Sequence, residues 1–378
     1  TDAPPDAGYC PLQPGAGPRP GSGEFRYRMR CVGDALRAAG VGAVYLMQGT
    51  FAALDSHGML AELARQYPDA KAAIDRLATQ IIDPAAGDAG NFTARYADVF
   101  QSQLATGGEE IPVRLLHWSG ENHHLGRADA AVRLIDEIAS LELPAGKRIL
   151  LWGHCHAGNV FALASNLLSG DVEAIEQFFA AARIYYRLPL TGIVDIPVWQ
   201  RVHNVLTKDP RRLAGRRLDF VTFGTPIRYG WDRRGYDGLL HFVNHRPADG
   251  CPLYRTPFPP SLDDVLRAAG GDYMQQVGIA GADTSPSRLA WRAWLANRRL
   301  TGLFEQNLAT DGLLNRLTRG MRVPEAGDTL LVDYGLPQES LAQHLAGHAV
   351  YTRKEWLLFH AEQVAERLYQ SVFRAGAA

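Results

Sequence analysis

Residues 149–158 read Ile-Leu-Leu-Trp-Gly-His-Cys-His-Ala-Gly, an apolar run that stops at a glycine two positions before a cysteine. A short apolar run of this kind is typical of a buried strand. Asn159–Leu168 continues with apolar residues at helical spacing. The small residues at Gly153 and at positions 157–158 let a strand and a helix approach closely on either side of a sharp turn. The stretch therefore predicts a strand, a tight turn centred on Cys155, and a helix.

This layout is that of a nucleophile elbow, Gly-x-nucleophile-x-Gly, whose central residue is held in a strained backbone conformation. Cys155 takes the central position, where most elbows of this kind carry serine. A thiol of ordinary pKa is only a few per cent thiolate at neutral pH, and a neighbouring imidazole raises that fraction. Cysteine is also often buried as an inert apolar residue. The small residues around Cys155 favour a nucleophilic role for this cysteine over that of an inert buried residue.

Three further segments resemble those of α/β-hydrolases, the lipase and esterase relatives. Val44–Phe51 is similar to the family's early strand ending in His-Gly-Thr or His-Gly-Gly, with Gln48 in place of the usual histidine. Asp219–Pro226 ends in Phe-Gly-Thr-Pro, similar to the lipase strand that follows the nucleophile helix. Gly347 and His348 stand near the C-terminus, where the family keeps its histidine. With the elbow, the segments occur in the order that the family shows.

The resemblance implies a triad of Cys155, His348 and a carboxylate. His348 is expected to take the thiol proton and return it to the leaving group, while the carboxylate fixes the tautomer of the imidazole and stabilises its cation. The backbone amides of His156 and of Thr50 or Phe51 are expected to form the oxyanion hole. The resemblance therefore implies hydrolysis of carboxylic esters or thioesters through an acyl-enzyme.

The family normally places the acid after the strand that precedes the last one. Leu239–Asn244 is that strand, and Asp249 follows it within a turn. Asp333 is the alternative, at the end of the last predicted strand. Asp237 precedes Leu239–Asn244 and is expected at the opposite edge of the sheet. Asp249 is the preferred acid, with Asp333 kept as the alternative.

Two other histidines compete with His348 for the role of base. His344 lies one helical turn before it, and His360 lies within an amphipathic helical pattern near the C-terminus. His360 is most simply a helix-face residue, and His344 a loop histidine with its own hydrogen bonds. His348 is preferred because Gly347 frees the backbone beside it and because its position matches the family's.

Histidines also flank Cys155 on both sides, and His123 and His124 follow the strand near Trp118, which suggests a metal site. Contiguous His-Cys-His residues in a tight turn chelate one zinc ion less readily than spaced ligands do, and the chain has no Cys-x-x-Cys partner. A metal enzyme is therefore the minor alternative, and neither a metal nor a cofactor is predicted.

Apolar runs predict strands alternating with helical patterns, of which Arg127–Leu141 is the clearest helix. This alternation predicts an α/β fold with a mostly parallel sheet flanked by helices on both faces. Phe25–Met29 alternates and predicts one more short strand. The other predicted strands are Val41–Met47, Pro112–Trp118, Arg148–Trp152, Leu218–Phe223, Leu239–Asn244 and Thr329–Tyr334.

Residues 1–24 are rich in proline and glycine and predict an irregular arm, and residues 25–378 predict a single α/β-hydrolase domain. Two segments exceed a minimal hydrolase, at about 169–215 and 250–326. Both are candidate helical lids. The aromatic series of the first insertion is expected to line an acyl pocket, whereas that of the second more simply packs on the core.

The 378 residues are 46% hydrophobic and 21% charged, with a formal net charge of −1. This balance fits a globular protein with a sizeable core and argues against binding nucleic acid or acidic membranes through bulk charge. No apolar run has transmembrane length, and no signal-peptide core is present at the N-terminus. A cytoplasmic protein is favoured, although the start at Thr1 leaves a removed leader open. Oligomeric state is not predicted.

Four cysteines are too few for a disulfide framework in a chain of this length. Cys10 and Cys31 are either bridged or both reduced.

The expected partner is a small or lipid-like acyl ester. Cysteine also stands at this position in dienelactone hydrolases and polyhydroxyalkanoate synthases, so acyl transfer remains an alternative to hydrolysis. A serine esterase inactivated by replacement of serine with Cys155 is another alternative. A third alternative is a binding protein of the same fold without turnover, because Gln48 and Cys155 both depart from the usual residues.

Overall fold

The computed structural model describes residues 8–49, 90–105, 110–144, 146–280, 283–304, 322 and 324–369. Their strands form one seven-stranded sheet in the order β1-β7-β6-β5-β4-β2-β3, and every neighbouring pair is parallel. The predicted α/β fold with a parallel sheet is therefore confirmed. The strands are β1 (Gly8–Leu12), β2 (Val41–Met47), β3 (Val113–Leu116), β4 (Arg148–His154), β5 (Arg217–Phe223), β6 (Gly238–Asn244) and β7 (Asp328–Val332).

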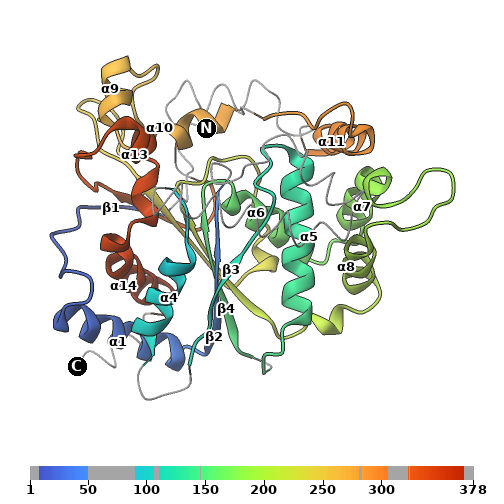
Figure 1. The fold of residues 1–378 in the computed structure, drawn as a ribbon, viewed down its shortest axis with the longest axis horizontal. Coiled ribbons are helices and arrows are strands. Elements are labelled where there is room, and N and C mark those ends of the chain that lie inside the picture. Colours follow the sequence, from blue (N-terminus) through green and yellow to red (C-terminus); the bar gives the residue numbers. More distant parts are fainter. Residues whose placement is uncertain are drawn as a thin grey trace.

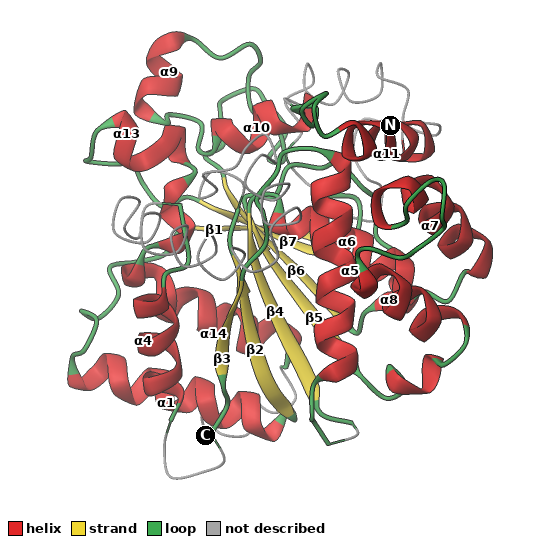
Figure 2. Ribbon diagram, turned by 45° about the vertical axis from the view of Figure 1, so that its right-hand side comes forward, coloured by secondary structure: helices red, strands yellow, loops and turns green. Residues whose placement is uncertain are grey.

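Helices cover both faces of this sheet (Figure 1). One face carries α1 (Gly23–Ala38), α4 (Ala94–Leu104) and α14 (Leu357–Leu368). The other carries α5 (His124–Ser140), α6 (Ala157–Leu168), α7 (Val172–Tyr186), α8 (Pro197–Thr207) and α11 (Trp291–Phe304). The short helices α9 (Leu262–Arg267), α10 (Tyr273–Ala280) and α13 (Leu341–His344) lie together at one end of the sheet (Figure 2).

The two hydrophobic cores follow from the alternation of side chains along the strands. In β2, Ala43, Tyr45 and Met47 face the core beneath α5 and α6, while Val44 and Leu46 face the core beneath α1 and α4. A strand buried on both faces reads as a continuous apolar run, as parallel strands covered by helices do. This is why the six later strands could be predicted with boundaries close to those observed.

The expected irregular arm at residues 1–24 contains a strand that was not predicted. β1 adds to the sheet edge alongside β7, with Gly8 opposite Asp328 and Leu12 opposite Val332. Proline is tolerated on an edge strand because one side of the strand needs no ladder hydrogen bond. Pro11 and the surrounding glycines therefore concealed a real edge strand.

The strand predicted at Phe25–Met29 was wrong, because these residues form the first turns of α1. Phe25, Met29, Val32 and Leu36 are all buried, at the three- and four-residue intervals of one helical face. The side chain of Ser22 accepts a hydrogen bond from the backbone N–H of Phe25 and so caps the helix. The short alternating pattern was the start of a helical one.

The segment at about 169–215 forms α7 and α8, and its aromatic residues pack on one another. The ring of Trp199 stacks on Phe178 at 5.6 Å and on Tyr186 at 5.3 Å between centroids. These rings are almost completely buried within the layer formed with α5 and α11. The aromatic series therefore packs within the helical layer, and the acyl pocket expected there stays a prediction. The described part of the second insertion forms α9, α10 and α11.

All four cysteines carry free thiols, so Cys10 and Cys31 are not bridged. None of the helices in the described ranges combines the length and apolarity that crossing a membrane requires.

Candidate functional site

The predicted turn at Cys155 is present at the carboxyl end of β4. The strand ends at His154 and α6 begins at Ala157, with Cys155 between them at a φ of 55°. Few residues other than glycine adopt this left-handed conformation, and it stores strain where it occurs. The backbone N–H of Cys155 donates to the carbonyl of Phe223 at 2.8 Å, which fixes the turn to β5.

The segment after β5 packs directly against the elbow. The hydroxyl of Thr225 donates to the carbonyl of Cys155 at 2.8 Å. A Cβ atom added at Gly158 would lie 2.1 Å from that hydroxyl oxygen. Only glycine therefore fits at this position, which is the physical reason for the small residue in the motif.

Gly158→Ala should lower the free energy of unfolding by about 1–3 kcal/mol, because the new methyl group overpacks the contact with Thr225. Gly302→Ala is the matched control, since Gly302 lies in α11 with nothing within 4 Å of an added Cβ. This control should be neutral or stabilising by up to about 1 kcal/mol through helix propensity. Urea unfolding measures both variants, and equal effects would contradict the tight packing of the elbow.

The end of β2 also approaches Cys155. A Cβ atom added at Gly49 would lie 2.5 Å from the Cβ of Cys155. Gln48 is buried, and its carbonyl accepts a hydrogen bond of 2.7 Å from the indole of Trp118. The predicted oxyanion donors Thr50 and Phe51 lie outside the described residues. The third, His156, is the N-cap of α6 and directly follows Cys155.

His348 lies in the same cluster and is completely buried. Its Nδ1–H donates to the carboxylate of Asp272 at 2.7 Å. Burial lowers the pKa of His348, but the charge of Asp272, followed by the effect of Cys155 and by the hydrogen bond to Asp272, outweighs burial and raises the pKa. Cys155 is thus one of the groups that act on the imidazole of His348, and the pairing of the two as nucleophile and base stays a prediction.

Neither of the two predicted acids is the carboxylate bonded to His348. Asp249 is exposed, and the alternative Asp333 forms an ion pair of 2.9 Å with Arg246. The carboxylate beside His348 is Asp272. Asp272, like Asp249, follows β6 along the chain, but it stands 23 residues after Asp249.

The chain returns to the end of β6 before it reaches Asp272. His245 and Gly271 form an antiparallel bridge, and the N–H of Asp272 donates to the carbonyl of Asn244 at 2.9 Å. Asp272 therefore stands next to the end of β6 in space, although residues 245–271 separate the two along the chain. No local pattern in the sequence marks that return.

The carboxylate of Asp272 is fully buried and held from several sides. Oδ2 accepts from His348 and, at 3.0 Å, from the hydroxyl of Tyr351. Oδ1 accepts from the backbone N–H of Gln275 at 2.8 Å in the first turn of α10. A buried charge is tolerated only when it is paired and hydrogen-bonded, and these contacts supply both.

The rival histidines have other partners. His344 accepts a hydrogen bond from the N–H of Gly347, and burial lowers its pKa. His360 is hydrogen-bonded to the hydroxyl of Tyr334 at 2.7 Å, and burial lowers its pKa to about 3. Among the described histidines whose pKa departs from the usual range, His348 is the one whose pKa is raised.

The histidines on either side of Cys155 support the turn. His154 donates from Nε2 to the carbonyl of His348 at 3.1 Å, and the two rings lie 4.4 Å apart. The amide of Asn159 joins Nδ1 of His156 to the carbonyl of Pro226. Burial is the main cause that lowers the pKa of both His154 and His156, so both are neutral. In the described part of the chain, no three His, Cys, Asp or Glu residues are placed to hold a metal ion.

His123 and His124 have separate roles at the start of α5. His123 caps the helix by accepting from the N–H of Gly126 at 2.9 Å. His124 is bonded to the hydroxyl of Tyr229, and burial, followed by the charge of Arg127, lowers its pKa to about 3. His123 is thus a helix cap and His124 a neutral core residue.

A charged cluster lies beside His124. Arg127 and Arg228 share the carboxylate of Asp283, each at 2.9 Å. Burial raises the pKa of Asp283, but the charges of the two arginines outweigh it and lower the pKa. The charges of Arg127 and Arg228 also act on His156 in the elbow. The negative charge of Asp283 acts on His156 in the opposite direction.

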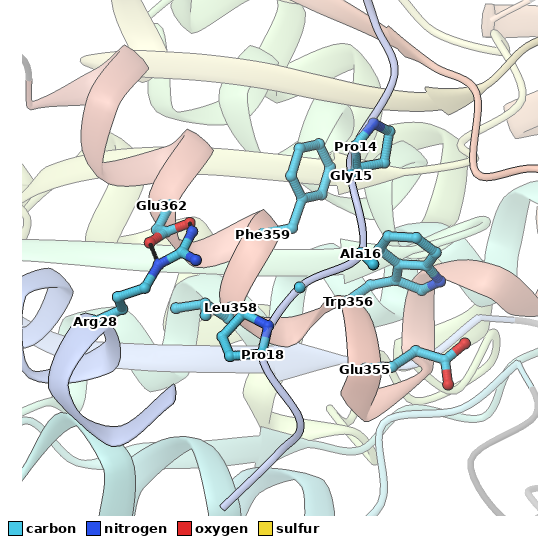
Figure 3. Close-up of a pocket in the computed structure, with 11 residues that line it drawn as sticks. Pro14, Gly15, Ala16, Pro18, Arg28, Glu355, Trp356, Leu358, Phe359 and Glu362 are labelled. Carbon is cyan, nitrogen blue, oxygen red and sulfur yellow. Dashed lines mark hydrogen bonds and ion pairs between the residues drawn. The ribbon is translucent and has the colours of Figure 1, made fainter. Parts of the chain in front are cut away.

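A cavity of about 290 Å³ lies elsewhere, between residues 14–18 and α14. Figure 3 shows the rings of Trp356 and Phe359 beside the segment that carries Pro14 and Ala16. The ion pair between Arg28 and Glu362, at 2.7 Å, lies at one side. Its lining includes no member of the Cys155 cluster, so we take the candidate site from the side-chain chemistry around Cys155.

Comparison of the chain with protein-family models, with curated proteins and with solved structures finds no match.

Proposed function

We propose that this chain is an enzyme of the α/β-hydrolase type that cleaves carboxylic esters or thioesters through an acyl-cysteine. The observation that carries the proposal is the arrangement of Cys155 at a left-handed turn between strand and helix, with His348 beside it and Asp272 on the far side of the imidazole. Nucleophile, base and orienting acid in this sequence of contacts define a triad by geometry and roles.

In the proposed reaction, His348 accepts the thiol proton and Asp272 stabilises the imidazolium. The sulfur of Cys155 attacks the acyl carbon, a C–S bond forms, and the carbonyl electron pair moves to the oxygen. The N–H of His156 donates to that oxygen, a contribution of about 3 kcal/mol. Collapse breaks the bond to the leaving group, which takes the proton from His348. Water, deprotonated by His348, then attacks the thioester and releases the thiolate.

The first experiment compares two thiols of the same chain. A thiol-reactive acyl probe at neutral pH should label Cys155 much faster than Cys251, which is free and only half-buried. Because Cys155 is the more buried of the two, faster labelling requires activation and not access. Equal labelling, or preference for Cys251, would favour a binding protein of this fold without turnover.

A series of p-nitrophenyl esters of increasing acyl length then defines the substrate. Release of nitrophenol that depends on Cys155 supports ester cleavage. Added alcohol or amine acceptors separate the two outcomes of the acyl-enzyme, because acyl transfer yields a new ester or amide and hydrolysis yields the free acid.

His348→Gln should make Cys155 behave like an unactivated thiol. The parent should react well at pH 6–7, because the raised pKa of His348 keeps a positive charge near the sulfur, and such a charge favours the thiolate form. In the variant, labelling should fall about tenfold for each pH unit below about 8.5. His344→Gln and His360→Gln are the controls and should keep the parent profile. An unchanged profile in His348→Gln would show that another group activates the thiol.

A further inference from the structure

Arg322 is a fully buried arginine at the loop that carries the acid. Its Nη1 donates to the carbonyl of Gly270 at 2.6 Å and to that of Asn244 at 3.3 Å. Its Nη2 donates to the side-chain oxygen of Gln276 at 3.2 Å. The guanidinium also lies 5.1 Å from the ring centre of Tyr273. All these partners belong to the end of β6 or to residues 270–276, on either side of Asp272.

Two of these contacts reach Asp272 through a single intermediate. The carbonyl of Asn244 accepts from both Arg322 and the backbone N–H of Asp272. The side chain of Gln275 donates to the carbonyl of Arg322, and its backbone N–H donates to the carboxylate of Asp272. Among the hydrogen bonds of the described residues, none joins Arg322 to Asp272 directly. Arg322 is thus one step removed from the acid.

Arg322 and Asp272 also interact by charge. Burial lowers the pKa of Arg322, whereas the negative charge of Asp272 raises it. A buried arginine is costly unless its charge is compensated, so its placement needs a reason. The charged or titratable groups that act on Arg322 or are acted on by it are Asp272, Tyr273, Tyr351 and His245.

We propose that Arg322 is a positioning residue for the proposed reaction. Its hydrogen bonds fix residues 270–276 to the end of β6 and so hold the carboxylate of Asp272 against His348. The inference rests on the proposed function of the Cys155 site. Arg322 touches neither the imidazole nor the thiol, and it acts through the acid alone. Loss of the Arg322 contacts would move the carboxylate of Asp272 away from His348. The imidazolium of His348 would then lose its main stabilising charge.

Loss of the Arg322 contacts should change the pH dependence of Cys155 labelling, and not only the stability of the fold. The groups facing His348 are the carboxylate of Asp272, the thiol of Cys155, the hydroxyl of Tyr351 and the rings of His154 and His156. Of these, Asp272 has the largest raising effect on the pKa of His348. If the carboxylate of Asp272 is displaced, the pKa of His348 falls. The imidazolium then gives less support to a thiolate at Cys155 at acid pH.

The test measures the rate of acyl-probe labelling of Cys155 between pH 5.5 and 9 in the full chain. Arg322→Gln should move the midpoint of the profile upward by about one pH unit, which is about a tenfold loss at pH 6.5. Arg322→Lys keeps the charge but loses the fork of hydrogen bonds, and should show a smaller shift. Gln276→Ala removes a single contact of Arg322 and should shift the profile slightly in the same direction.

Arg246→Gln is the matched control. Arg246 holds the same loop, since its guanidinium donates to the carbonyls of Ala268 and Ala269 and pairs with Asp333. This variant should lower the melting temperature and leave the labelling profile unchanged. If Arg322→Gln does not fold, Arg322→Lys and Gln276→Ala decide the matter.

Parent-like profiles in Arg322→Lys and Gln276→Ala would overturn the role of Arg322 while leaving the proposed function intact. A profile shift of equal size in Arg246→Gln would reduce Arg322 to a general structural residue and also overturn its role. If His348→Gln leaves the labelling of Cys155 unchanged, the result would contradict the proposed function itself. The role of Arg322 would fall with it.

Discussion

Cys155→Ala is expected to lower ester cleavage by at least about 10³-fold, because the proposed acyl-enzyme cannot form without the sulfur. The melting temperature should change little. Cys155 lies in a turn, and its backbone N–H and carbonyl keep their contacts with Phe223 and Thr225 in the variant. Nitrophenol release and a thermal melt measure the two quantities. Undiminished activity would mean that Cys155 is structural.

Cys155→Ser distinguishes a site built for a serine nucleophile from a site built for a cysteine nucleophile. The hydroxyl keeps the geometry but needs stronger activation than a thiol. A gain in hydrolysis would indicate a site built for serine, in which Cys155 is a replacement. A loss would indicate a site tuned to a thiolate, as the raised pKa of His348 suggests.

Asp272→Asn has the second largest expected effect, a fall in kcat of about 10²–10⁴-fold. The neutral amide removes the negative charge that raises the pKa of His348 and offers no fixed acceptor for its Nδ1–H. The shape of the side chain is kept, so the folded state should persist. Rates of ester cleavage at saturating substrate measure the change.

Asp249→Asn and Asp333→Asn are the controls for this prediction. Asp249 is exposed, and Asp333 pairs with Arg246 at the far side of the loop. Both variants should keep about the parent rate. A large loss in Asp249→Asn together with a mild one in Asp272→Asn would restore the acid that the sequence favoured and refute the proposed triad.

The elements that could be predicted from the sequence are those specified by local patterns. The strand runs, the turn at Cys155 and the glycine-bearing segment before His348 each depend on a few consecutive residues. An added Cβ would clash with Thr225 at Gly158 and with Cys155 at Gly49, so the small residues in these segments also mark close tertiary approaches. Gly347, which precedes His348, has a φ of 89°, a conformation that favours glycine.

The elements that could not be predicted depend on tertiary contacts. Asp272 reaches His348 because residues 245–271 fold back onto the end of β6, and Arg322 reaches the same loop from a distant part of the chain. β1 forms because the edge of β7 supplies its hydrogen bonds, and its own sequence carries a proline. None of these contacts leaves a periodic or spaced signal near the residues concerned.

The central claim is that Cys155 carries the acyl group during turnover. The most direct measurement is mass spectrometry of the chain mixed with a p-nitrophenyl ester and quenched during the first turnovers, followed by peptide mapping. The account predicts one acyl group on the peptide that contains Cys155, accumulating in the parent and absent from Cys155→Ala. Continued nitrophenol release with no acyl group on Cys155, or with the group on another residue, would contradict it.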